Sequence, residues 1–280
     1  MNLGKAWVLV WAILVACALP APGANKKRVL LLAQGPDGHP RRTHEYRAGV
    51  KVLAQCLQRA PQVEVTTVSA DGEWLAGPEL IRKADCVVLF LSEGAKWIHA
   101  EPRRLEAFAE HAAGGGGLVT IHWAMGTREA KNIDGYLKLF GGCHGGEDRR
   151  YKVVDTTVKV TPNHPVTVGL QDFKIHEEFY FKLKFVDADR SIQSILKAEI
   201  EGKQETVAWA WNRVDGGRSF GFSGGHFHEN WKRLEYRRLI GQAVLWTSKI
   251  EPPAAGLNVD VPDEIYKLPP PKSPTPRADP

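Results

Sequence analysis

The sequence predicts an α/β fold in which helices cover both faces of a largely parallel sheet. In the first half of the chain, short runs made almost only of apolar residues alternate with stretches whose apolar residues recur at helical spacing. Fully apolar strands are typical of a parallel sheet that is buried on both faces. In the middle of the chain the strands become alternating, and we expect them to extend the sheet with antiparallel pairs.

Each predicted element follows from its local pattern. Apolar runs bounded by Gly, Pro or Asp predict strands at 28–34, 63–69, 86–92, 118–123 and 218–225. Helical spacing predicts helices at 43–58, from about Pro78, at 102–113, 133–142 and 231–248. Alternating apolar residues predict the added strands at 151–160, 173–185, 191–200 and 205–214.

The N-terminal segment predicts export. Lys5 is followed by an uncharged apolar run over 6–19, which is shorter than the ~20 residues that a membrane span needs. We interpret 1–24 as a signal peptide. Alternatively, "LVAC" resembles a bacterial lipoprotein processing box, which would leave a lipid on Cys17 as the sole membrane attachment. Either way, we expect a periplasmic, cell-envelope or secreted protein.

One domain over 25–250 and a Pro-rich extended tail over 251–280 follow from the composition. The formal net charge is +5, but the basic residues are scattered among acidic ones, so we expect no nucleic-acid partner. The exported chain keeps Cys56, Cys86 and Cys143, an odd number that argues against a disulfide framework. The glycine run at 114–117 lacks a following Gly-Lys-Ser/Thr, and we expect no nucleotide cofactor.

Histidines follow several of the predicted parallel strands. His44 comes after the first, His122 ends the strand at 118–123, and His226 and His228 follow the last. Ligands of open α/β sheets bind beyond the carboxyl ends of the strands, so these positions suggest a site. Neutral imidazoles there would suit a transition metal, an acid–base role or a structural role, and the pattern leaves the three open.

Five ordered motifs resemble a known family. They are "GHPRRTHEY", "GGGGLVTIHWAMG", "TPNHPVTVGL", "HEEFYF" and "FGFSGGHFHENW". Together they are similar to the ThuA-like (trehalose-utilisation) domain, from about Arg28 to Lys249. The resemblance implies the flavodoxin-like fold of the class I glutamine amidotransferases and a role in sugar metabolism, notably of trehalose and oxidised sugars.

The same resemblance argues against glutamine hydrolysis. Amidotransferases carry a Cys nucleophile at the sharp turn from a strand into a helix, called the elbow, and a His-x-Glu pair after a later strand. In this chain His122 occupies the elbow position, and His226 and His228 occupy the positions of the pair. Without a thiol at the elbow, attack on an amide is not expected. We therefore predict that His122, His226 and His228 converge on one pocket, where they would hold a divalent metal such as Zn²⁺.

The remaining candidates are acid–base groups and sugar contacts. On a strand, His176, Glu178 and Tyr180 would share one face. The family's pattern resembles an acidic pair followed by Tyr, which Glu177-Glu178 and Tyr180 match. The predicted catalytic residues are His176, Glu178, Tyr180 and His44. The predicted substrate-binding residues are Trp123, His144, Phe227 and Trp231.

Two functions remain open at this point. The first is an exported carbohydrate-processing enzyme, a hydrolase or isomerase acting on a sugar, a disaccharide or an oxidised-sugar derivative. The second is a non-catalytic carbohydrate-binding or accessory module on the same fold. Stoichiometric metal in the purified protein would favour the enzyme.

Overall fold

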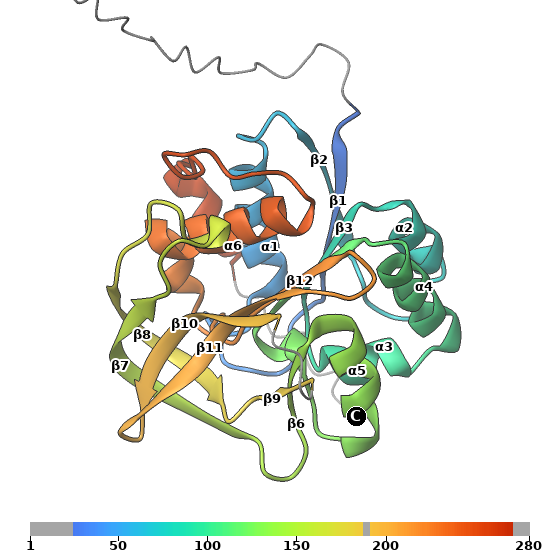
Figure 1. Ribbon diagram of the computed structural model, residues 1–280, viewed down its shortest axis with the longest axis horizontal. Helices are drawn as coiled ribbons and strands as arrows, with labels where there is room; N and C mark the ends of the chain where they lie inside the picture. Colours follow the sequence, from blue (N-terminus) through green and yellow to red (C-terminus); the bar gives the residue numbers. More distant parts are fainter. Residues whose placement is uncertain (1–24, 187–190, 271–280) are drawn as a thin grey trace, which may run out of the picture.

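The computed structural model describes residues 25–186 and 191–270 (Figure 1). The predicted signal peptide with Cys17 and the last ten residues of the predicted tail lie outside this part of the chain. Within it, no helix combines the length and apolarity that crossing a bilayer requires.

A nine-stranded sheet forms the centre of the molecule, in the order β2-β1-β3-β4-β12-β11-β10-β7-β8. β2, β1, β3, β4 and β12 pair in parallel, and every pairing from β12 to β8 is antiparallel. The predicted sheet is therefore confirmed. Its strands are β1 (Lys27–Ala33), β2 (Val63–Ser69), β3 (Cys86–Phe90), β4 (Gly117–Ile121), β7 (Arg150–Val160), β8 (Phe173–Phe181), β10 (Ile192–Ile200), β11 (Lys203–Asn212) and β12 (Arg218–Phe222).

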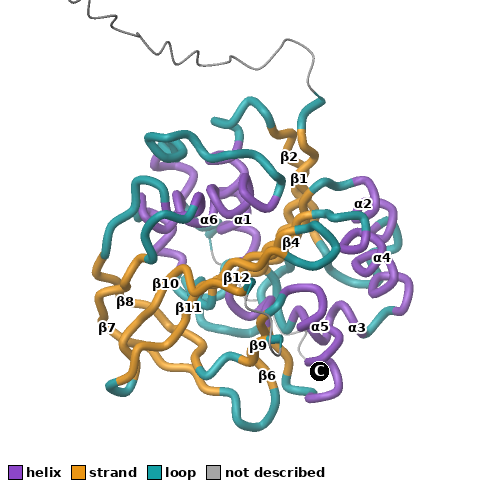
Figure 2. The backbone as a smooth tube through the Cα atoms, viewed as in Figure 1, coloured by secondary structure: helices purple, strands orange, loops and turns teal. Residues whose placement is uncertain are grey.

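Helices cover both faces of this sheet, as Figures 1 and 2 show. The helices are α1 (Tyr46–Leu57), α2 (Gly77–Lys83), α3 (Gly94–His99), α4 (Pro102–Ala113), α5 (Ile133–Phe140) and α6 (Leu234–Thr247). Short 3₁₀ turns are η1 (His122–Met125), η2 (Ala130–Asn132), η3 (Pro165–Thr167), η4 (His228–Lys232) and η5 (Asp263–Tyr266). A small second sheet joins β5 (Gly126–Thr127), β6 (Gly142–Gly145) and β9 (Lys184–Phe185).

The apolar runs are fully apolar because each strand feeds two cores. In β1, Leu31 packs into the cluster that contains the buried residues of α1 and α6. Leu30 and Leu32 point the other way, into the cluster beneath α2–α5. Each fully buried leucine contributes roughly 1.5–3 kcal/mol, so a polar residue on either side of β1 would be costly.

β8 is the last strand of the sheet, yet its side chains contact residues that follow the central strands. Its side chains alternate as predicted: Glu177 and Phe179 face one core, whereas Glu178 and Tyr180 face the other side. The Tyr180 hydroxyl lies 3.1 Å from the ring of His122, directly after β4, and Glu177 bonds the loop after β12. The antiparallel extension therefore brings its own side chains to the carboxyl ends of the central parallel strands.

The segment after α6 lies against the domain. Over 251–270 it is mostly irregular, as its Pro-rich composition predicts, and η5 is its only helical turn. Its few large apolar side chains are nevertheless buried in the α1–α6 core, namely Leu257, Val259 and Tyr266. This stretch thus contributes to the folded unit.

Candidate functional site

Four side chains from distant parts of the chain converge at the carboxyl edge of the sheet. They are His44 from the loop after β1, His122 after β4, His226 after β12 and Glu178 of β8. Each offers one ring nitrogen or carboxylate oxygen, and these atoms all lie within 4.8 Å of one another. We call this group the histidine centre.

Unusual backbone holds the two central histidines. His122 and His44 have φ values of +54° and +52°, in the left-handed region that residues other than glycine rarely adopt. Gly225 makes room for His122, because a Cβ at position 225 would come within 2.7 Å of the His122 Cβ. Such strained positions persist only where the surroundings enforce them, and they cluster at functional sites.

The ring nitrogens of His44 and His122 face each other. Their Nε2 atoms are 2.9 Å apart. His122 Nδ1 is 2.9 Å from the Ser223 carbonyl, which can only accept, so this nitrogen carries the proton. His44 Nδ1 is 2.8 Å from an Asp37 carboxylate oxygen and donates in the same way. Both Nε2 atoms are then acceptors, and two lone pairs point at each other.

Burial keeps these rings neutral. Burial and the neighbouring rings of His44, His226 and His144 hold the pKa of His122 well below its ordinary value. Burial, with the neighbouring His44 and His39 rings, lowers the pKa of His226 to about 4. Burial also lowers the pKa of His44, although its bond to Asp37 opposes this. Neutral imidazole is the form that ligates metals.

Tyr180 lies between two histidines. Its ring stacks on His122 with centroids 4.4 Å apart, and on His144 with centroids 4.1 Å apart. Burial raises the pKa of the Tyr180 hydroxyl well above its ordinary value, so the phenol keeps its proton. It can donate a hydrogen bond to the lone pair of His122 Nε2.

Glu178 stands beside the histidines without bonding either. Its Oε1 is 3.8 Å from His122 Nε2 and 3.4 Å from His226 Nδ1. His226 Nδ1 is buried and makes no hydrogen bond within the described residues. Burial raises the pKa of Glu178 to about 7. A carboxyl group with this pKa can take up or release a proton near neutrality.

Glu177, which sequence reasoning did not select, organises the loop that carries His226. Its fully buried carboxylate accepts hydrogen bonds from backbone N–H groups and side chains. The donors are the backbone N–H groups of Glu178, Gly225, His226 and Phe227, the Asn230 amide and the Tyr236 hydroxyl. Burial raises the pKa of Glu177 to about 7 while these bonds lower it. Because all of its partners can donate, the arrangement suits the ionised carboxylate.

The prediction that His228 joins His122 and His226 is not met, because the chain turns into η4 at His228. Its Nε2 instead faces the Tyr266 carbonyl at 3.0 Å. Residues i and i+2 share a face only within a strand, and β12 ends at Phe222, before both histidines. His44 occupies the place in the cluster that was expected for His228.

Other predicted residues fall into two groups. Trp123 and His144 are buried next to Tyr180.

His176 is exposed, pairs with Asp155 at 2.9 Å and stacks on Phe227, so it does not reach the centre. Trp231 is 1% exposed and packs against Phe90 in the core, because η4 turns its ring inward. It has no face for a sugar.

A cavity of about 530 Å³ adjoins the His44 side of the centre. Asp37, His39 and His44 line one wall, and Leu268 to Pro270 line another. The His39 ring stacks on His44 with centroids 3.6 Å apart, and its Nδ1 lies 2.7 Å from Asp37. The histidine centre therefore lies between this cavity and the face of the β7–β8 pair that carries Glu178 and Tyr180.

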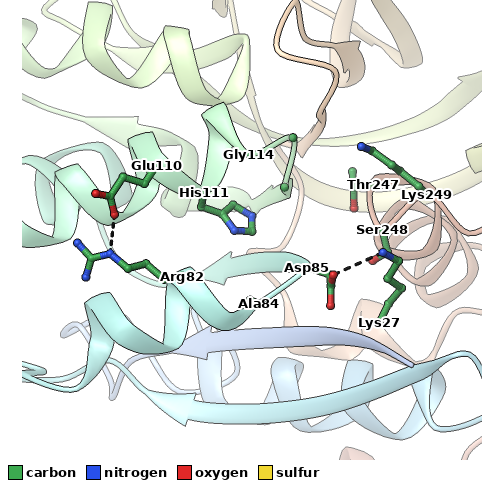
Figure 3. Close-up of a pocket in the computed structure, with 12 residues that line it drawn as sticks. Lys27, Arg82, Ala84, Asp85, Glu110, His111, Gly114, Thr247, Ser248 and Lys249 are labelled. Carbon is green, nitrogen blue, oxygen red and sulfur yellow. Dashed lines mark hydrogen bonds and ion pairs between the residues drawn. The ribbon is translucent and has the colours of Figure 1, made fainter. Parts of the chain in front are cut away.

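A second cavity, of about 280 Å³, lies at the opposite edge of the sheet (Figure 3). It is lined by residues just before β3 and β4 and at the end of α6. Four of its charged groups form two pairs, Lys27 with Asp85 and Arg82 with Glu110. Its His111 Nε2 lies 3.0 Å from the Gly117 carbonyl. These five side chains have partners within the protein, and no group of histidines and carboxylates like the histidine centre lies here among the described residues.

None of the three cysteines in the described part of the chain is placed for nucleophilic attack. Cys56, Cys86 and Cys143 are free and buried. Burial raises the pKa of Cys143 to about 12, so it stays a thiol. The turn after β4 begins with His122, whose backbone is left-handed, and not with a cysteine.

The fold and the centre together define an α/β protein with a largely parallel central sheet and histidines at the carboxyl ends of its strands. The family described as "ThuA: Trehalose utilisation" matches residues 28–247, and the chain belongs to this family. Its context is therefore the utilisation of a carbohydrate. No curated protein is similar enough in sequence to count as a match.

Two solved ThuA-like structures share the fold, and a third solved structure has a lower TM-score. A ThuA-like protein from Bacteroides uniformis is 15% identical, with a TM-score of 0.62 over 82% of this chain and 95% of its own. A ThuA-like protein from Parabacteroides merdae is 16% identical, with a TM-score of 0.60 over 80% of this chain and 90% of its own. The glutaminase domain of Trypanosoma brucei CTPS is 10% identical, with a TM-score of 0.43 over 83% of this chain and all of its own.

Proposed function

We propose that this chain is an exported enzyme that processes a sugar, a disaccharide or an oxidised-sugar derivative. In this proposal His44, His122 and His226 hold one divalent metal ion such as Zn²⁺, and Glu178 and Tyr180 transfer protons beside it. Membership of the trehalose-utilisation family supports the substrate class. The apolar run over 6–19 supports export.

The observation that most supports a metal ion is that the Nε2 atoms of His44 and His122 face each other. Two acceptor lone pairs 2.9 Å apart repel unless something positive lies between them. A shared proton would join His44 to His122 only. A cation also uses the buried Nδ1 of His226, which has no hydrogen bond among the described residues, and faces the Glu178 carboxylate.

The donor set fits such an ion. Ligand atoms around a tetrahedral zinc ion, with bonds of ~2.1 Å, lie about 3.4 Å apart. The separations here run from 2.9 Å to at most 4.8 Å, so small side-chain shifts would complete the geometry. Three neutral imidazoles leave an open position, as catalytic zinc sites do. Asp37 behind His44 is the carboxylate that commonly orients a ligating histidine.

The chemistry divides among these groups. The ion supplies a Lewis acid for a carbonyl or hydroxyl oxygen of the sugar. Glu178, with a pKa of about 7, takes a proton from the substrate or returns it. Tyr180 keeps its proton at neutral pH and donates a hydrogen bond to a second sugar oxygen once His122 Nε2 is engaged as a ligand.

The test is metal content measured by inductively coupled plasma mass spectrometry, with His122→Asn compared to His228→Ala. Asn tolerates the left-handed backbone at position 122, so this variant should fold. We expect about one ion per chain in the natural protein and in His228→Ala, and none in His122→Asn. A panel of disaccharides and their keto forms, with and without chelator, then identifies turnover.

Two results would overturn the proposal. One is a folded natural protein that takes up no Zn²⁺, Co²⁺, Ni²⁺ or Mn²⁺ on dialysis. The other is metal that His122→Asn retains and His228→Ala loses.

A further inference from the structure

Two exposed apolar side chains stand next to the histidine centre. Tyr151 is 63% exposed and Val153 is 43% exposed, and both belong to β7. Within the described residues, the other exposed large apolar side chains are Leu75, Val214 and Leu234. Only Tyr151 and Val153 share a strand, and their i, i+2 spacing puts them on the same face.

The strand register ties this face to the site. Tyr151 pairs directly with Tyr180, and Val153 with Glu178. Directly opposite residues of an antiparallel pair lie on the same side of the sheet. The Tyr151 ring meets the Tyr180 ring edge to face, with centroids 6.5 Å apart. Tyr151 therefore contacts the ring of Tyr180, whose hydroxyl hydrogen-bonds His122.

We propose that Tyr151 and Val153 form the apolar wall of a sugar-binding subsite. One face of the substrate's pyranose ring packs against this wall while a neighbouring carbon faces Glu178 and Tyr180. This subsite rests on the proposed function and names where its substrate binds. A pyranose has a face of C–H groups that suits an aromatic ring, and burying both surfaces removes apolar area from water.

The extent of the wall fits one sugar ring better than a protein partner. The next pair along the same face is Asp155 and His176, which are exposed and hydrogen-bonded to each other. The apolar area is thus limited to two side chains, far below the ~800 Å² per partner of a stable protein interface.

A polar group without a protein partner lies close by. His144 stacks on the side of Tyr180 away from His122, and its buried Nδ1 makes no hydrogen bond within the described chain. Buried polar atoms normally have a partner, and a sugar hydroxyl would supply one after a small movement of the ring. An apolar wall and a placed polar group are the usual components of a small-molecule site.

The experiment compares Tyr151→Ala, Tyr151→Phe and Val214→Ala. Val214 is an exposed apolar residue outside the site and serves as the matched control. Binding of trehalose and of its keto form is measured by calorimetry on the purified protein, with KM and kcat where turnover is found. We expect Tyr151→Ala to weaken binding and raise KM about three- to tenfold with metal content unchanged. Tyr151→Phe, which keeps the ring, should restore most of the loss.

The outcomes separate this inference from the proposed function. If the natural protein binds a sugar and Tyr151→Ala binds it equally well, the subsite is wrong and the proposed function stands. If the metal-loaded protein binds neither sugar nor any disaccharide of the panel, the proposed function fails and the subsite with it. If the protein is a dimer that Tyr151→Ala dissociates, the wall is an interface and the subsite is overturned.

Discussion

The two edges of the central sheet treat their histidines and charges in opposite ways. At the amino edge, His111 faces a backbone carbonyl, and Lys27 and Arg82 each meet a carboxylate. At the carboxyl edge, two histidine nitrogens face each other, and His226 Nδ1 has no hydrogen bond among the described residues. Both edges have a cavity, so a cavity alone does not mark the site.

The difference shows how a functional edge departs from a stable one. His111, Lys27 and Arg82 at the amino edge are satisfied within the protein, which is what stability alone requires. The carboxyl edge keeps left-handed backbone at His44 and His122 and acceptors without donors, and both features cost free energy. A bound ligand would recover that cost.

The largest expected effect comes from changing one histidine at each edge. His44→Asn, which suits the left-handed backbone, should lower turnover on the order of 10²–10⁴-fold by removing one group of the centre. His111→Ala should lower the free energy of unfolding by about 1–3 kcal/mol and leave kcat unchanged. Turnover assays and urea denaturation measure the two. Equal losses of kcat would remove the contrast between the edges.

Glu177 and Glu178 allow a second test within the carboxyl edge. Glu177→Ala leaves several buried donors without an acceptor and should cost about 3–5 kcal/mol of stability, measured by urea denaturation. Glu178→Gln should change stability by less than about 1 kcal/mol and lower kcat, because Glu178 lies 3.8 Å from His122 Nε2 and 3.4 Å from His226 Nδ1 without a hydrogen bond to either. The reverse pattern would exchange their structural and catalytic roles.

Asp37 should act on metal affinity through His44. Hydrogen bonds from His44 and Tyr46 hold the pKa of Asp37 below its usual range, although burial opposes them. Asp37→Asn should weaken metal binding about 10- to 100-fold, measured by competition with a chelator. The control is Asp71→Asn, which removes a carboxylate paired with Arg47. If both variants bind metal like the natural protein, Asp37 does not orient a ligand.

The smallest expected effect is the pH dependence from His164, which lies beside Trp246 at the end of α6. Burial, with the nearby Arg218, lowers the pKa of His164 to about 4. The folded state disfavours the charged ring, so its stability contribution is complete above about pH 6.5 and is lost as pH falls toward 4.

His164→Asn retains an acceptor for the Val166 N–H and removes the titration. The unfolding free energy should therefore fall less between pH 7 and pH 4.5 in this variant than in the natural protein. The difference between the two losses should be on the order of 1 kcal/mol. An identical pH dependence in the two proteins would mean that His164 is not held neutral. Metal content at pH 7 should be the same in both.

Much of the fold could be predicted from the sequence because its signals are local. Apolar runs such as 86–92 form strands wherever two cores bury them, and helices between such strands require parallel pairing. The rule that ligands bind past carboxyl ends also placed His122 and His226 at the right edge. Side-chain alternation on β8 correctly put Glu178 and Tyr180 on one face.

Which side chains meet was decided by the tertiary structure. His228 is two residues from His226, yet it leaves the cluster because η4 begins there, whereas His44 joins across 182 residues from His226 because both loops leave the same sheet edge. The role of Glu177 depends on the contact between β8 and the loop after β12. The place of Tyr151 beside the centre depends on the pairing of β7 with β8. Strand spacing determines the face of a side chain, but not which element the folded chain brings opposite it.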